Sequence, residues 1–434
     1  MIFRLRGGSV LLPAGLMISV IAAMLGLGQA AVAQPVENWR IPEADLPRIL
    51  LSDAERERAR SSLVGIVTGA PGGVYAQLGN DLMRLLNDRG QQTLRVAPIL
   101  GQGSVNNLAD LRHLPRVDFG IVQSDVLEVY ERTEAGRELR SSIRYVTRLH
   151  NEFLHILSRR DIVGDEPASV CKLANRRINV AGVRSGTAIT VRTVLNGILG
   201  LGMSLDSSDS TEEGIEQLRA GRVDSVAFVV GKPAPIFKQQ DRRDFMESRF
   251  VFVSVPIALL QEGCGRRPAS ELSGRSPYEA AQIIEADYPG LVAQDRPVET
   301  IAIPAVLAAY AWPSSSGRSQ AASEFVRRFF ALATDPRNGL GRPNGGFSPQ
   351  WCGIDLARDV KNWKRYEAAE VMLREHSGAS FVIRCGGARL ASCSDPNLLQ
   401  TEFAAWYARQ FPSQSASGAS YISAYEAYRR DNCG

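Results

Sequence analysis

The chain has 434 residues, of which 44% are hydrophobic and 22% are charged, and its formal net charge is +4. This length and composition predict a globular protein with a substantial core and two or three domains. The net charge is too small to indicate a nucleic-acid-binding protein, so no nucleic acid is expected as a partner.

The first 33 residues have the pattern of a secretory signal peptide. Arg4 and Arg6 form a short positive region, and the uncharged residues 7–33 end in Ala31-Val32-Ala33. This order predicts cleavage after Ala33 and a periplasmic location. The apolar part is long enough that an uncleaved membrane anchor stays open as an alternative. Residues 34–60 are polar and predict a lead-in with one short helix.

Residues 61–150 alternate between strand and helix. Strands are expected at 62–68, 94–99 and 117–122, with helices at 73–89 and through Leu108 and Leu111. The alternation restarts with strands near 153–157, 177–182, 223–230, 250–256 and 300–309. Such alternation predicts parallel βαβ units and an α/β fold. We expect one lobe from residues 61–150 and 300–334, and a second from residues 151–299.

Residues 335–434 form an expected C-terminal extension that is mainly helical. Its beginning, 335–349, is rich in Gly, Pro and Asn, as loops are. Helical segments are expected near 361–375, 397–411 and 421–430. Tyr421, Tyr425 and Tyr428 would share one helical face, which we interpret as a packing face, with partner docking as the lesser alternative.

Export makes disulfide bonds expected, and six cysteines allow 15 pairings that sequence does not resolve. Their clustering favours one bond between the first two and pairing among the last four: Cys171, Cys264, Cys352, Cys385, Cys393 and Cys433. Because there is no CxxC motif and the four histidines are scattered, we expect no metal site and no cofactor.

Three expected strand–turn–helix junctions combine glycine with small hydroxyl or amide residues: Thr68–Tyr75 with Gly72 and Gly73, Gly103–Asn107, and Ser185–Thr187. The open N–H groups of a helix N-terminus suit an anion. The hydroxyls of Thr68, Ser104, Ser185 and Thr187 would add to this site, and Arg184 would add charge. The alternatives are that Ser104 and Ser185 only cap helices, and that Arg184 is a surface charge.

Enzyme signatures are not found in the sequence. There is no GxxxxGK[ST] motif and no GxGxxG after the first strand, and residues 182–186 do not form GxSxG. His155 lies in an apolar strand and is expected to be a core residue, whereas His113 is expected on a helix surface. A hydrolase using Ser185 would rest on one hydroxyl, so we expect no catalysis.

Taken in order, the motifs resemble the TAXI family of solute-binding proteins, the extracytoplasmic receptors of TRAP-type transporters. The resemblance covers about residues 61–330 and rests on TGAPGGVY at 68–75, GSVNNL at 103–108, DFGIVQSD at 118–125, SGT at 185–187, DSVAF at 224–228, YPGL at 288–291 and the run from Thr300. It implies a two-lobed periplasmic-binding-protein fold, type II-like, with a hinge. It also implies a monomer that traps a small organic anion, a dicarboxylate or acidic amino acid, and passes it to TRAP-type membrane subunits.

By position, the resemblance implies ligand contacts at Tyr75, Ser104, Asn107, Gln123, Ser185 and Thr187, with Gly186 between the last two. Thr68, Gly72 and Gly73 would shape the first turn. The chain departs from the family in having Tyr75-Ala76 where two tyrosines are common, and Arg184 where a glycine is common. The extension leaves a second hypothesis open, a sensory or scaffold protein that presents a ligand-dependent surface to a membrane partner.

Overall fold

The computed structural model describes residues 52–385 with short gaps, the longest at 88–93, 238–248 and 266–275, and scattered residues of 399–429. The predicted signal peptide, most of the predicted lead-in, Cys393 and Cys433 lie outside the described residues. Contacts divide the chain into two compact units, residues 1–56 and 57–434. Within the described part, we find no helix with the length and apolar character needed to cross a membrane.

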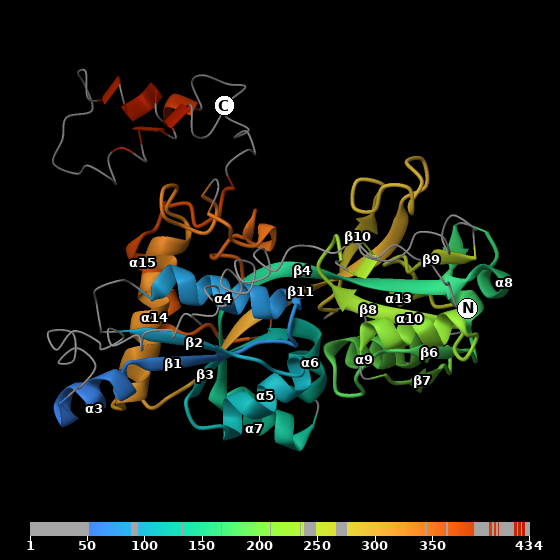
Figure 1. Ribbon diagram of the computed structural model, residues 1–434, viewed down its shortest axis with the longest axis horizontal. Helices are drawn as coiled ribbons and strands as arrows, with labels where there is room; N and C mark the ends of the chain where they lie inside the picture. The colour runs from blue at the N-terminus through green and yellow to red at the C-terminus, as the bar shows by residue number, and fades with distance from the viewer. Residues whose placement is uncertain are drawn as a thin grey trace, which may run out of the picture. The chain divides into compact units, whose positions relative to one another are not determined.

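The first lobe is built on parallel strands with covering helices (Figure 1). The central strand, β1, pairs in parallel with β2 on one side and β3 on the other, which confirms the predicted βαβ units. The apolar residues of α4 recur at helical spacing, so one face of that helix lies in the core. The elements are α3 (Asp53–Ser61), β1 (Leu63–Val67), α4 (Val74–Leu86), β2 (Arg95–Ile99), α5 (Ser104–His113), β3 (Val117–Gln123), α6 (Ser124–Glu131) and α7 (Glu134–Ser142).

Two long strands connect the lobes. β4 (Ile143–Arg159) is far longer than the strand predicted at 153–157. Its first half pairs with β11 (Val298–Tyr310), and its second half pairs with β8 (Ser225–Val230) and β9 (Phe250–Ser254). β11 lies between β3 and β4, antiparallel to both. The sheet order is β2-β1-β3-β11-β4-β8-β6-β7, where β6 is Arg177–Asn179 and β7 is Ser204–Asp206. Both lobes therefore share one sheet, and the predicted two-lobed α/β fold is confirmed.

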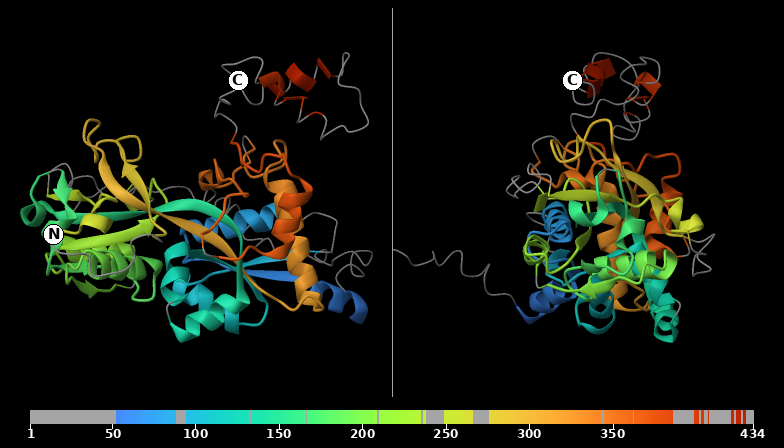
Figure 2. Two further views of the ribbon diagram at one scale, coloured as in Figure 1. Left: turned by 180° about the vertical axis from the view of Figure 1, so that it is seen from behind. Right: turned by 90° about the vertical axis from the view of Figure 1, so that its right-hand side faces the viewer.

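The second lobe, drawn in green to yellow in Figure 2, has a separate core. Its strand β6 pairs in parallel with β7 on one side and β8 on the other. The expected helix after Ser185 begins as α9 and continues directly as a π-helix over Arg192–Ile198. The elements are α8 (Arg160–Val163), β5 (Ala168–Ser169), β6 (Arg177–Asn179), α9 (Gly186–Val191), β7 (Ser204–Asp206), α10 (Thr211–Arg219), β8 (Ser225–Val230), β9 (Phe250–Ser254), α13 (Leu259–Glu262) and β10 (Glu279–Ile283).

Residues 345–383, assigned by sequence to the extension, pack in the core of the first lobe. Trp351 is fully buried beside Phe329 of α14 (Gly317–Ala333), and its indole Nε1 donates to Asp81 Oδ2 of α4 at 3.0 Å. Asp81 also accepts from the Ser348 backbone N–H at 2.8 Å. The short helix α15 (Glu367–Glu375) lies against α14 in the same core. The lobe and extension boundaries remain predictions.

Two disulfide bonds join described cysteines. Cys171 pairs with Cys264, which confirms the favoured pairing of the first two cysteines. Cys352 pairs with Cys385, consistent with pairing among the last four. Disulfide bonds form and persist mainly in oxidising compartments outside the cytoplasm, so these two bonds agree with the expected export.

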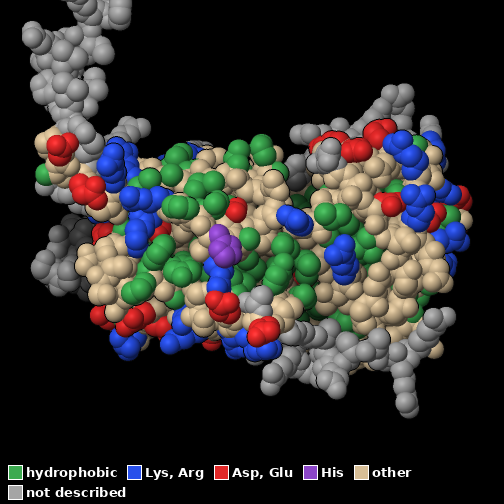
Figure 3. Space-filling view, turned by 90° about the horizontal axis from the view of Figure 1, so that it is seen from below, with side chains coloured by type: hydrophobic (Ala, Val, Ile, Leu, Met, Phe, Trp, Pro, Cys, Tyr) green, Lys and Arg blue, Asp and Glu red, His purple; other side chains and the backbone are tan. Residues whose placement is uncertain are grey.

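The tyrosine stripe near the C-terminus packs, as the sequence analysis favours. The rings of Tyr421, Tyr425 and Tyr428 surround Phe403, with ring centroids 4.9, 5.1 and 5.4 Å from it. These aromatic residues form a small core of their own. Elsewhere, Lys and Arg side chains are interspersed with Asp and Glu on the face seen in Figure 3, in keeping with the small net charge.

Candidate functional site

The structure brings the predicted turns of the two lobes together. Gly103, the residue before α5, has φ 112°, and a Cβ there would lie 3.7 Å from Ser185 Cα of the second lobe. A Cβ on Gly186 would lie only 1.2 Å from Gln123 Oε1 of the first lobe. Both positions therefore favour glycine, and a larger residue at 186 would push Gln123 away.

In the first lobe, several of the predicted contacts hold the turns in shape. Asn107 Nδ2 donates to Thr68 O at 2.5 Å and to Ile121 O at 2.7 Å. Thr68 Oγ1 donates to Ile99 O at 2.9 Å. Ser104 Oγ accepts from the Gln123 backbone N–H at 3.0 Å. These bonds tie the ends of β1, β2 and β3 to the start of α5.

The start of α4 leaves its first N–H groups open. Gly72 has φ +77°, which suits the turn, and Gly73 precedes the helix. Because glycine has no side chain, neither Gly73 nor Gly103 supplies a side-chain cap to α4 or α5. Within the described part of the chain, the N-termini of both helices therefore retain the partial positive charge and uncapped N–H donors that an anion requires.

In the second lobe, Ser185 acts as a helix cap. Its Oγ accepts from the Ala188 N–H at 3.1 Å and donates to Val180 O at 3.2 Å. Thr187 Oγ1 accepts from the Val229 N–H at 3.0 Å, which joins α9 to β8. Arg184 is exposed beside this turn, and no hydrogen bond or ion pair within the described part of the chain holds its side chain.

Beneath these turns lies a buried group of titratable and amide side chains, here called the polar cluster: Tyr75, Gln123, Asp125, His150 and Glu152. The Tyr75 hydroxyl donates to Glu152 Oε2 at 2.6 Å. The His150 ring lies edge-on to the Tyr75 ring at 6.2 Å. Sequence reasoning nominated Tyr75 and Gln123 and missed the other three.

The two carboxyl groups of the cluster come from different elements. Glu152 lies on β4, the long strand shared by the lobes, and both it and His150 of the same strand lie against Tyr75. Asp125 is in the first turn of α6, and its Oδ2 accepts from Thr190 Oγ1 of α9 at 2.6 Å. The Tyr278 hydroxyl lies 3.3 Å from the same oxygen. Asp125 thereby connects the first lobe to the second.

Burial is the largest cause of the pKa shifts of the carboxyl and imidazole groups in this cluster. It raises the pKa of Glu152 to about 8, with the neighbouring Asp125 charge adding to the rise and the Tyr75 hydrogen bond opposing it. Burial likewise raises the pKa of Asp125 to about 6, against the hydrogen bonds from Thr190 and Tyr278. It lowers the pKa of His150 to about 4. Near neutral pH, Glu152 therefore holds a proton and His150 is uncharged.

Several polar atoms of the cluster have no hydrogen-bond partner among the described residues. They are Gln123 Nε2, Asp125 Oδ1 and both ring nitrogens of His150. The neighbouring Ser124 Oγ also has no hydrogen-bond partner among these residues. A buried polar group without a partner costs about 1–3 kcal/mol. Because such groups are few in folded proteins, their gathering in one place indicates a site that a bound molecule completes.

Residues 66–315 match the model of the NMT1-like family, and this range spans more than half of the chain. The chain belongs to the NMT1-like family. The matched range includes every residue of the polar cluster and all three turns, whereas residues 345–383 lie beyond it. The curated proteins include no match to this NMT1-like chain.

Solved structures resemble this NMT1-like protein only distantly. The periplasmic VFT2 domain of Bordetella pertussis BvgS is 15% identical, with TM-score 0.30, over 64% of this chain and 98% of that one. The periplasmic binding protein BugD is 12% identical, with TM-score 0.36, over 64% and 84%. The GluR0 ligand-binding core with L-glutamate is 12% identical, with TM-score 0.33, over 62% and 97%. At TM-scores this low, these likenesses carry no conclusion about ligand or partner.

We expect Glu152 to lower the free energy of unfolding of this NMT1-like protein by roughly 2 kcal/mol between about pH 6 and pH 8. The lowered pKa values of the buried His150 and His155 oppose this fall, because their neutral forms are favoured as pH rises. The folded-state pKa of Glu152, about 8, is raised from the ordinary 4.5. In this window the unfolded carboxyl is ionised and the folded one is protonated, so folding takes up a proton and weakens as pH rises. The stabilisation is complete below the unfolded pKa and is lost toward pH 8.

Urea unfolding at the two pH values measures this effect. Glu152→Gln keeps the shape and the acceptor oxygen but cannot ionise, so the variant should lose the fall that Glu152 contributes and keep the opposing effect of the histidines. A pH dependence equal to that of the parent would show that another group is responsible.

Proposed function

We propose that the chain is an extracytoplasmic solute-binding protein that holds a small organic acid between its two lobes. The observation that carries this proposal is the polar cluster, where buried polar atoms without partners lie under the open N-termini of α4 and α5. The side chain of Tyr75, in the first turn of α4, interacts with that of Ser104, in the first turn of α5. The polar cluster therefore lies next to both helix N-termini. A carboxylate at the helix N-termini would receive the free N–H groups.

Of the two solute classes that the sequence resemblance implies, the cluster favours an amino acid over a dicarboxylate. Glu152 and Asp125 are buried without an ion-pair partner in the described part of the chain. A second carboxylate placed here would meet the charge of Asp125, which is ionised near neutral pH, whereas an ammonium group would stabilise that charge and would also favour ionisation of Glu152. We therefore propose that the solute's carboxylate lies toward the helix N-termini and its ammonium group toward Asp125 and Glu152.

The proposed setting follows the resemblance to the TAXI family. The protein would act as a monomer in the periplasm and would deliver its solute to TRAP-type membrane subunits. The described disulfide bonds support export. Closure of the lobes would bring Gln123 against Gly186, as in the present structure, and would enclose the solute.

We expect acidic and neutral amino acids to raise the melting temperature of the protein, and dicarboxylates to raise it less. A ligand present at 100 times its dissociation constant stabilises the folded state by about 2.7 kcal/mol. A thermal-shift panel with glutamate, glutamine, succinate, 2-oxoglutarate and phosphate provides the test. Stabilisation by succinate and by no amino acid would contradict the assigned solute class, and no shift with any of them would contradict the binding function.

A further inference from the structure

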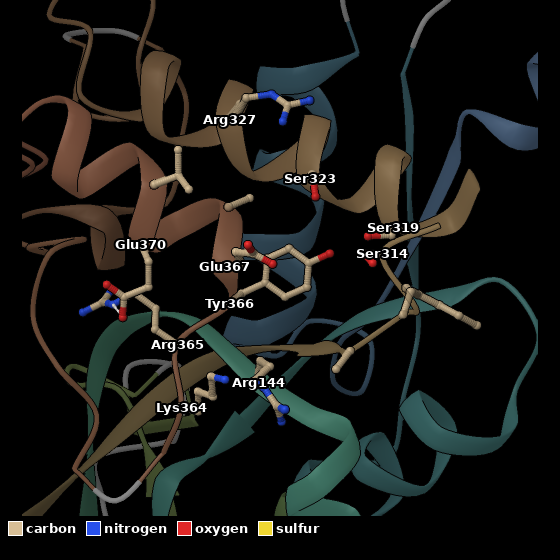
Figure 4. Close-up of a pocket in the computed structure, with 14 residues that line it drawn as sticks. Arg144, Ser314, Ser319, Ser323, Arg327, Lys364, Arg365, Tyr366, Glu367 and Glu370 are labelled. Atoms are coloured by element: carbon tan, nitrogen blue, oxygen red, sulfur yellow. Dashed lines mark ion pairs between the residues drawn. The ribbon is translucent and has the colours of Figure 1, made fainter. Parts of the chain in front are cut away.

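A separate cavity of about 660 Å³ lies in the first lobe, and none of its lining residues belongs to the polar cluster. Its walls come from the start of β4, the loop after β11, the first half of α14 and residues 364–371 (Figure 4). Small-molecule sites commonly have volumes of about 300–1,000 Å³, so this cavity is large enough for a metabolite.

Backbone hydrogen bonds hold the floor of this cavity in place. The Tyr145 N–H donates to Lys364 O at 3.1 Å, and the Tyr366 N–H donates to Tyr145 O at 2.7 Å, so residues 364–366 extend the sheet beside β4. The Arg365 guanidinium is buried below, where it donates to Leu356 O at 3.2 Å and Ala357 O at 2.8 Å. A cavity with such a fixed floor needs little reorganisation to bind a ligand.

One wall of the cavity carries a row of hydroxyl groups. Ser319 and Ser323 are four residues apart on α14 and therefore share a face of that helix. Both interact with the side chain of Tyr366, whose ring points toward α14 in Figure 4. Ser314 adds a further hydroxyl at the cavity edge. Such a row suits a molecule that offers several hydrogen-bonding groups.

The lining has an excess of positive charge. Arg144, Arg327, Lys364 and Arg365 line the cavity with Glu367 and Glu370, which gives 4 − 2 = +2. Of the four cations, Arg365 is engaged with backbone carbonyls, Asp359 and Glu370, and Arg327 pairs with Glu324. Arg144 uses its Nη1 to donate to the backbone carbonyls of Arg140, Ser141 and Ile143. Lys364 is exposed and makes no ion pair with a described residue. Its ammonium group is thus available to an anionic ligand, which would also meet Nη2 of Arg144, because the bonds to the backbone carbonyls use only Nη1.

We propose that this cavity is a second binding site, for a small hydroxylated organic anion that bears a phosphate or carboxylate group. The anionic group lies between Lys364 and Arg144, and the hydroxyl groups of the ligand face Ser319 and Ser323. The rings of Trp312 and Tyr366 cover its body. The site is independent of the solute proposed between the lobes.

Titration calorimetry on the whole chain tests this site with glucose 6-phosphate, gluconate and glucose at millimolar concentration. We expect at least one of the two anions to bind and glucose to bind much more weakly; if only one anion binds, its group identifies the chemistry. Lys364→Met should weaken binding about tenfold, as expected for the loss of one charge-assisted hydrogen bond. Lys361→Met, at an exposed lysine outside the cavity lining, should leave it unchanged.

Tyr75→Phe distinguishes the two sites, because Tyr75 belongs only to the polar cluster. We expect this variant to bind the anion as the parent does. Three results would each overturn the proposal. They are equal affinities of the Lys364→Met and Lys361→Met variants, loss of anion binding in Tyr75→Phe, and no binding of either anion.

Discussion

Trp351→Ala is expected to lower the free energy of unfolding by about 3–5 kcal/mol, the usual cost of removing a fully buried tryptophan. Trp351 has no exposed surface, its ring packs on Phe329, and its indole N–H bonds to the buried Asp81. The substitution therefore opens a cavity and removes one of the donors to a buried carboxylate. Urea unfolding monitored by circular dichroism measures the loss.

Leu100→Ala is the matched control, because Leu100 is 61% exposed and its truncation opens no cavity. We expect this variant to stay within about 0.5 kcal/mol of the parent, as most surface changes do. If Trp351→Ala were no more destabilising than Leu100→Ala, residues 345–383 would not form part of the first-lobe core. Truncation before residue 350 would then also leave the lobe folded, contrary to the packing described above.

Gly186→Leu is expected to weaken binding of the solute by about 10- to 100-fold, since overpacking a close contact costs about 1–3 kcal/mol. A side chain here would collide with Gln123 Oε1 when the lobes meet. Because open lobes have no such contact, the variant should fold and should lose mainly its closed, ligand-holding state. Titration calorimetry with the best amino acid of the panel measures the change.

Gly182→Leu provides the comparison on the same turn. A Cβ at Gly182 meets no atom within 4 Å, and the residue is exposed. We expect this variant to bind the solute as the parent does. Equal affinity of the two leucine variants would mean that closure between Gln123 and Gly186 is not needed for binding.

Much of the fold could be predicted because local patterns and tertiary packing agree. The apolar run before Thr68 forms β1, and the glycines at 72 and 73 lead into α4, as the spacing predicts. The turn at Ser104 and the one at Ser185 also start helices. Glycine and small hydroxyl residues govern these turns through the backbone, so their sequence signal is strong.

The acidic part of the site was missed because it lies where the strand pattern is broken. The mostly polar stretch from Arg148 to Glu152 predicts a loop, and only its pairing with β11 makes it part of one long strand. Asp125 lies two residues after Gln123, at the start of a helix, where nothing in the local sequence distinguishes it from an ordinary first-turn acid. The alternation of His150 and Glu152 just before the apolar run at 153–157 was the available signal.

The packing of residues 345–383 also escaped sequence reasoning. The Gly-, Pro- and Asn-rich stretch 335–349 has the composition of a linker, but Arg84 of α4 donates to Gly345 O at 2.8 Å and Gly346 O at 2.7 Å. Its guanidinium also lies 4.6 Å from the centre of the Phe347 ring. Loop composition reports backbone freedom and does not report which tertiary contacts hold the loop.

A crystal structure of the chain with the amino acid that stabilises it most would test the central claim most directly. We expect the solute between the lobes, with its carboxylate at the N-termini of α4 and α5 and its ammonium group within hydrogen-bond distance of Asp125 or Glu152. A solute bound elsewhere, with none of its atoms within hydrogen-bond distance of the polar cluster, would contradict the proposed site.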